Sequence, residues 1–141
     1  MLAVYNSTFS FHAWIIRGDN TGMNVEIFTV SLGFDQCYVL RGDSVLVVDS
    51  GEPNKGAVFT HALETAAISL NEVKLIVLTH GHWDHIGSAG EIKSLTGAAL
   101  AMHQSEVHWL ENSLKPISPG ITAWGRVLKV LHNIFMPFIK V

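Results

Sequence analysis

Four side chains able to bind metal are crowded into the segment LTHGHWDHIG, residues 78–87. They are His80, His82, Asp84 and His85. Imidazole nitrogens and carboxylate oxygens are ligands that Zn²⁺ favours, and Fe and Mn use the same donors. Residues two apart in an extended segment project to one side, so we expect His80 and His82 to reach one metal. Asp84 and His85, further along the turn, would reach a second.

Two plainer interpretations of this segment are a histidine-rich surface turn and a helix cap, with Asp84 capping a helix that begins near Ile86. A string this dense, directly after an apolar run, favours metal binding over both. Gly81 is expected to let the backbone bend sharply between the first two histidines. Histidine must be neutral to bind metal, so metal affinity should fall below about pH 6.5.

The elements that must position these residues read as strands and helices in alternation. Three short β-rich runs come first, at 25–33, 34–42 and 44–51. The third contains the continuously apolar VLVV and ends in Asp49-Ser50-Gly51. Next come a helix over 53–70, a buried strand over 73–79, the histidine segment, a helix over 88–97 closed by Gly97, a strand over 98–103 and a helix over 104–112. This order predicts a layered α/β (α+β) fold in which a mixed sheet has helices on one face.

The two ends of the chain differ from this pattern. Residues 1–22 are interpreted as an N-terminal extension, with the domain beginning at Met23. Residues 113–138 are interpreted as a helical insertion whose apolar stripe includes Trp124 and Phe135. We expect this stripe to pack against the body of the fold. The alternative is a roof over the metal site that favours an apolar acyl group.

Composition limits the classes of partner. The net charge is −3 and the sequence pI about 6.2, which predicts neither a nucleic-acid partner nor an anionic membrane. Cys37 is the only cysteine and lies in a strand-like run, so it reads as a small buried residue rather than a nucleophile. A chain with no internal disulfide is expected in a reducing compartment, here the cytoplasm.

The quoted motifs resemble those of the metallo-β-lactamase fold hydrolases. THGHWDHIGS matches the family pattern H-x-H-x-D-H, and VLVVDSG resembles the family strand that ends in an aspartate before a small residue and a glycine. The order of elements from about Val25 to Asn112 is similar to the N-terminal half of that family. The resemblance implies that residues 23–141 form half of an αβ/βα sandwich. Ser88 stands where many members have a second glycine.

Roles for individual residues follow from this resemblance. His80 and His82 would bind one metal, and Asp84 and His85 a second, with zinc in both sites of the complete fold. Asp49 would orient a ligand or a metal-bound water, although a strand-end turn is its plainer role. Asp84 would act as the catalytic residue, orienting the attacking water and carrying a proton to the leaving group.

The resemblance also implies that part of the site is missing from this chain. The family takes further ligands from its second half, whereas His103, His108 and His132 lie outside the family's ligand contexts and no T-P-G-H string occurs. We therefore expect a metal-dependent hydrolase of ester, thioester, lactone or lactam-type bonds that is truncated and weakly active or inactive as this chain. The alternative is a non-catalytic fragment or interaction module that self-associates through its exposed sheet. Expected partners are a small-molecule substrate and either a second copy of the chain or the missing C-terminal half.

Overall fold

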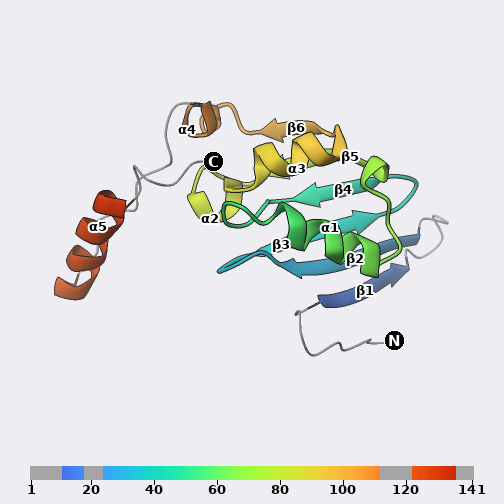
Figure 1. Cartoon of the computed structure of the whole chain (residues 1–141), viewed down its shortest axis with the longest axis horizontal. Helices are drawn as coiled ribbons and strands as arrows, with labels where there is room; N and C mark the ends of the chain where they lie inside the picture. Colours follow the sequence, from blue (N-terminus) through green and yellow to red (C-terminus); the bar gives the residue numbers. More distant parts are fainter. Residues whose placement is uncertain (1–10, 18–23, 112–121, 136–141) are drawn as a thin grey trace.

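The computed structural model describes residues 11–17, 24–111 and 122–135. Their strands form one sheet in which neighbours in space are neighbours in sequence (Figure 1). The strands are β1 (Phe11–Arg17), β2 (Asn24–Ser31), β3 (Gln36–Arg41), β4 (Val45–Val48), β5 (Val73–Leu78) and β6 (Ala99–Met102). Pairing is antiparallel from β1 to β4 and parallel from β4 to β6. The mixed sheet predicted from the sequence is therefore confirmed.

The first strand corrects one expectation. Phe11–Arg17 pairs along β2, with Phe11 opposite Val30 and Arg17 opposite Asn24. This part of residues 1–22 is thus an edge strand of the sheet and not a separate extension. The sequence obscured it because the turn-forming stretch RGDNTG follows it and the clean strand pattern begins only afterwards.

The helices confirm the predicted alternation with shorter bounds. They are α1 (Gly56–Thr65), the 3-10 helix η1 (Leu70–Glu72), α2 (Trp83–Ile86), α3 (Ala89–Thr96), α4 (Val107–Glu111) and α5 (Ala123–Phe135). Both α1 and α3 lie over the same face of the sheet (Figure 1). Gly97 ends α3 as expected: its φ is 69°, and its N–H donates to the carbonyl of Lys93 at 2.8 Å.

The core lies between that face and the helices. Alternate residues of the central strands point into it, as in β3, where Cys37 and Val39 are buried while Tyr38 between them is 43% exposed. The helices contribute Phe59, Leu63 and Ile92, all fully buried. This packing fixes the positions of the strand ends. The histidine segment begins at the end of β5, so its start is fixed too.

The opposite face of the sheet is apolar and only half-buried. Leu40 pairs with Leu46, which pairs in turn with Leu75, so the three side chains form a row across β3, β4 and β5. Tyr38 lies on the same face beside this row, since it is two residues from Leu40. No described helix covers this face, in agreement with the predicted one-sided arrangement (Figure 1).

Helix α5 also presents an apolar surface. Its stripe is exposed, with Trp124 at 68%, Phe135 at 61% and Leu131 at 43%. The expectation that this stripe packs against the body is therefore wrong for the described residues. A stripe at helical spacing shows only that one face is apolar and leaves open what covers that face. Within the described ranges, no helix is long and apolar enough to cross a bilayer.

Candidate metal centre

The candidate metal centre lies at one edge of the sheet because of strand direction. Parallel strands β4 and β5 end side by side, which brings Asp49, after β4, next to the segment that begins at His80, after β5. Strand β3 runs the other way, so its first residues, and the turn containing Asp35, lie at the same edge. Residues far apart in sequence therefore meet there.

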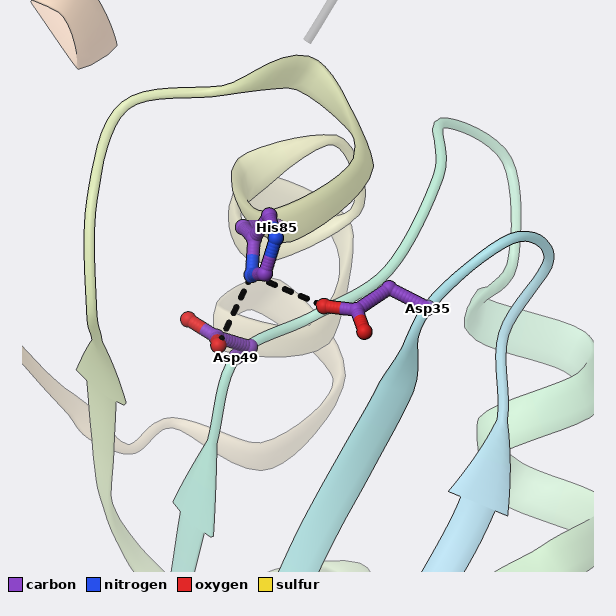
Figure 2. A group of neighbouring side chains, drawn as sticks. All are labelled: Asp35, Asp49 and His85. Carbon is purple, nitrogen blue, oxygen red and sulfur yellow. Dashed lines mark hydrogen bonds and ion pairs between the residues drawn. The ribbon is translucent and has the colours of Figure 1, made fainter.

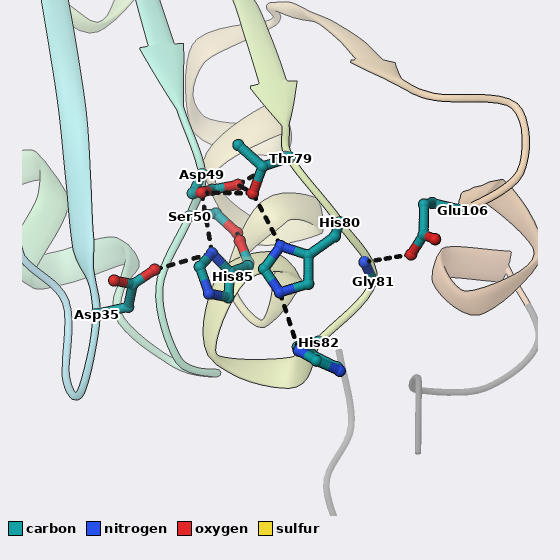
Figure 3. A network of polar contacts seen from close by, with 9 residues as sticks. All are labelled: Asp35, Asp49, Ser50, Thr79, His80, Gly81, His82, His85 and Glu106. Atoms are coloured by element: carbon teal, nitrogen blue, oxygen red, sulfur yellow. Dashed lines mark hydrogen bonds and ion pairs between the residues drawn. The ribbon is translucent and has the colours of Figure 1, made fainter. Parts of the chain in front are cut away.

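Asp49 is the centre of a hydrogen-bond network (Figure 3). Its carboxylate accepts the backbone N–H of Thr79 at 2.8 Å and the Thr79 hydroxyl at 2.9–3.0 Å. The side chain is nearly buried, and the backbone has a φ of 60°, which aspartate adopts more readily than most residues. Asp49 is thus more than a strand-end turn residue, because it pins the start of the histidine segment.

Thr79 connects Asp49 to the first two histidines. Its hydroxyl lies 3.0 Å from His80 Nδ1, and His80 Nε2 lies 2.9 Å from His82 Nδ1. A carboxylate can only accept, so the Thr79 proton goes to Asp49 and the hydroxyl oxygen accepts Nδ1–H of His80. His80 is then the tautomer whose Nε2 carries a lone pair, and that lone pair faces His82.

His85 is held by Asp49 as well, and by further contacts. Its Nδ1 lies 2.9 Å from Asp49 Oδ2 and 2.8 Å from Asp35 Oδ2 (Figure 2). Its backbone carbonyl accepts both the N–H and the hydroxyl of Ser50, each at 2.8 Å. The centroids of the His80 and His85 rings are 4.0 Å apart. The loop after β4 therefore fixes both the backbone and the ring of His85.

The first histidine pair fits a metal ion. Two nitrogens bound to one tetrahedral zinc at about 2.0–2.1 Å lie about 3.3 Å apart. His80 Nε2 and His82 Nδ1 are 2.9 Å apart, so a shift of a few tenths of an ångström would let both bind. A second group, Asp35, Asp49 and His85, offers three ligand-type atoms within 4.8 Å of one another.

Asp84 lies in the first turn of α2 and is half-buried. The N-cap of α2 is His82, so the capping role considered for Asp84 is wrong. Among residues 24–111, no hydrogen bond or ion pair of its carboxylate is seen. The structure thus joins Asp49, His80, His82 and His85 in one network through Thr79 (Figure 3). Asp84 is not part of this network.

The backbone between the first two histidines is held from the far side. The carboxylate of Glu106 accepts the N–H of Gly81 at 3.0 Å, and a Cβ at Gly81 would lie 2.6 Å from Cβ of Trp109. Glycines with positive φ in the described ranges are Gly33, Gly51 and Gly97. The expected bend at Gly81 is present. Because the φ of Gly81 is not positive, the physical reason for glycine there is the close approach of Trp109.

Several contributors were not anticipated from the sequence. Asp35, Thr79 and Glu106 carried no spacing signal, although Thr79 directly precedes the motif. His103 and His108 are exposed, in keeping with their interpretation as surface residues. The predicted burial of Cys37 is confirmed. Burial, and then the negative charges of Asp49 and Asp35, raise the pKa of the Cys37 thiol far above its ordinary value, so this thiol is not a nucleophile at neutral pH.

Comparisons with known proteins agree with this geometry. A probable metallo-hydrolase, YybB of Bacillus subtilis, is 34% identical over 73 residues, which are 52% of this chain and 31% of that protein. A metal-dependent hydrolase of Thermococcus onnurineus is 46% identical over 55 residues, 38% of this chain and 22% of that one. The subclass B3 metallo-β-lactamase BJP-1 of Bradyrhizobium japonicum superposes with a TM-score of 0.54 and 28% identity, over 60% of this chain and 33% of that one.

These matches cover about a third of the relatives' length or less. Within this chain the match is broad, because the sequence profile of the metallo-β-lactamase superfamily aligns with residues 31–135, from the end of β2 to the end of α5. Strands β3 to β6, the helices on one face and the histidine segment after β5 are all contained in that range, whereas β1 and nearly all of β2 precede it. The chain belongs to the metallo-β-lactamase superfamily.

Proposed function

We propose that this chain is the metal-binding part of a cytoplasmic metal-dependent hydrolase that acts on small molecules. The bond cleaved would be an ester, thioester, lactone or lactam-type bond. The observation that carries the proposal is the 2.9 Å approach of His80 Nε2 to His82 Nδ1, with the other ring nitrogen of His80 fixed by Thr79. Membership of a superfamily of metal-dependent hydrolases supports it.

The proposed ligands are arranged as two pairs. His80 and His82 would hold one metal, and Asp84 and His85 the other, with zinc the first choice and Fe or Mn the alternatives. A bound divalent metal would polarise the scissile carbonyl and acidify a water. The half-exposed Asp84 could then turn towards the metal that it would share with His85, because no contact among the described residues holds its carboxylate.

The chain's own residues would position these groups and move protons. Asp49 holds His80 through Thr79 and holds His85 directly, so both rings keep their orientation. Asp84 would accept the proton of the attacking water and give it to the leaving group. Two protein ligands per metal are fewer than the three usual for catalytic zinc, so we propose that the chain alone hydrolyses slowly.

Hydrolysis assays with and without zinc test this proposal. Chromogenic thioester, lactone and β-lactam substrates would be offered to the wild type, to Asp84→Asn and to His103→Ala as an exposed control. We expect slow, zinc-dependent turnover of at least one substrate, lost in Asp84→Asn and kept in His103→Ala. Turnover that is independent of zinc, or unchanged in Asp84→Asn, would contradict the assignment.

A second candidate function rests on the apolar surfaces. The row Leu40, Leu46 and Leu75 and the stripe of α5 could form a self-association surface in a non-catalytic module. Size-exclusion chromatography with light scattering distinguishes the two proposals. A metal-free, folded dimer that is disrupted by Leu46→Lys favours the module, whereas a monomer that binds zinc favours the hydrolase.

A further inference from the structure

We propose that Asp35 is a positioning residue for His85. Its carboxylate oxygen Oδ2 lies 2.8 Å from Nδ1 of His85, whose N–H donates to Asp49, and the two carboxylates together hold the ring so that Nε2 is presented to the metal site (Figure 2). This inference rests on the proposed function only in taking Nε2 as the ligand atom.

A hydrogen bond and a close charge contact hold the imidazole of His85. Its Nδ1–H donates to Asp49 Oδ2 at 2.9 Å, and Asp35 Oδ2 lies 2.8 Å from the same nitrogen. A ring nitrogen that carries a proton has no lone pair for a metal, so Nε2 is the nitrogen left to bind one. The group of Asp35, Asp49 and His85 is therefore a clamp on one imidazole.

A second carboxylate beside His85 has a purpose, because Asp49 accepts hydrogen bonds from both Thr79 and His85. Oδ2 of Asp49, which accepts from His85, also lies 2.9 Å from the Thr79 hydroxyl, and its Oδ1 accepts the Thr79 N–H. An oxygen that serves two donors holds each less firmly than one that serves a single donor. Asp35 approaches His85 from the β2–β3 turn, and two carboxylates in different directions limit rotation of the ring about its Cβ–Cγ bond.

The turn that carries Asp35 is itself fixed in place. The N–H of Leu32 donates to the carbonyl of Asp35 at 3.2 Å, and the N–H of Phe34 donates to the Glu52 carboxylate at 3.0 Å. The Phe34 ring meets Trp83, the first residue of α2, edge to face with centroids 6.1 Å apart. Helix α2 also carries His85. The turn therefore contacts α2 twice, through Phe34 with Trp83 and through Asp35 with His85.

Nitrogen NMR of the imidazole rings tests the clamp without metal. In ¹⁵N-labelled, metal-free protein at about pH 8, where an ordinary imidazole is neutral, wild-type His85 should carry its proton on Nδ1. Asp35→Ala should shift His85 towards a mixture of tautomers. Asp35→Asn should restore the wild-type pattern, because its amide oxygen can occupy the same place beside Nδ1–H. Asp43→Ala removes the same charge from an exposed turn and should change nothing.

Zinc competition against a chromophoric chelator provides the second readout. We expect Asp35→Ala to weaken zinc binding about tenfold, at the lower end for groups that orient a ligand, with Asp35→Asn and Asp43→Ala near wild type. If Asp35→Ala does not fold, Asp35→Ser replaces it, with the same expected results. An unchanged His85 tautomer in a folded Asp35→Ala or Asp35→Ser protein overturns the proposal. A shifted tautomer with no zinc binding, even in the wild type, supports the clamp and counts against the proposed function.

Discussion

Asp49 Oδ2 lies 2.9 Å from Nδ1 of His85, and this contact joins the end of β4 to helix α2. The same carboxylate holds Thr79, which precedes His80. Asp49 therefore sets the relative positions of two candidate ligands that come from different parts of the motif. Because this one carboxylate, which is 5% exposed, holds both Thr79 and His85, its removal should affect both folding and metal binding.

Asp49→Ala should destabilise the metal-free protein by about 1–3 kcal/mol. It removes the acceptor of the exposed Thr79 and the half-buried His85, and it places alanine at a φ of 60°. Urea unfolding monitored by circular dichroism measures the change. Asp43→Ala, in an exposed turn, should unfold like wild type. Equal urea midpoints for Asp49→Ala and wild type would show that the network contributes little.

Much of this arrangement could be predicted from the sequence, because it depends on local pattern. The apolar runs before Asp49 and His80 indicated buried strands, and such strands end at one edge of a sheet when they are parallel. Asp35 and Glu106 could not be predicted. Their contacts depend on how the β2–β3 turn and the segment after β6 fold back onto the motif, which no spacing in the sequence encodes.

The same dependence on contacts between residues distant in sequence explains where the expectations differ from the structure. The bend expected at Gly81 is present, but the need for glycine there comes from Trp109, 28 positions later in the sequence. The α5 stripe has the same pattern whether or not another element covers it. The pairing of β1 with β2 was not expected, because the loose alternation before the turn-forming stretch RGDNTG does not reveal what it pairs with.

Gly81→Ala should weaken zinc binding and lower stability. The new Cβ would lie 2.6 Å from Cβ of Trp109, so the backbone between His80 and His82 must move. Overpacking of this kind costs about 1–3 kcal/mol. Gly90→Ala is the matched control, because no atom lies within 4 Å of its new Cβ. Thermal unfolding and zinc competition measure both effects, and identical behaviour of the two variants would refute the proposed steric role.

Ser88→Gly should destabilise the protein by about 1–3 kcal/mol, even though glycine is common at this point of the family motif. The buried Ser88 hydroxyl donates to the carbonyl of Glu52 and accepts the N–H of Lys55 at 2.9 Å. Its loss leaves both groups to find new partners. Ser94→Ala, on the exposed side of α3, is the control, and urea unfolding midpoints would decide. A Ser88→Gly midpoint at or above wild type would contradict this role.

Cys37 should resist thiol reagents until the protein unfolds. Burial, followed by the charges of Asp49 and Asp35, raises its pKa above the ordinary value of 9.0. The unfolded chain therefore releases the thiol proton first, and the free energy of unfolding should decline as pH rises above 9.0. Reaction with a chromogenic disulfide at about pH 8, with and without denaturant, measures accessibility. Fast reaction of the native protein would contradict the buried thiol, and Cys37→Ser should flatten the alkaline decline.

Calorimetric titration of zinc into the metal-free protein tests the central claim most directly, namely that the histidine segment after β5 is a metal centre. Wild type, His80→Ala, His82→Ala and the exposed control His103→Ala would be compared at one pH and ionic strength. The account predicts that wild type and His103→Ala bind zinc alike and that each of the other two loses more than about tenfold in affinity. Equal zinc affinity in all four proteins, or none in the wild type, would contradict it.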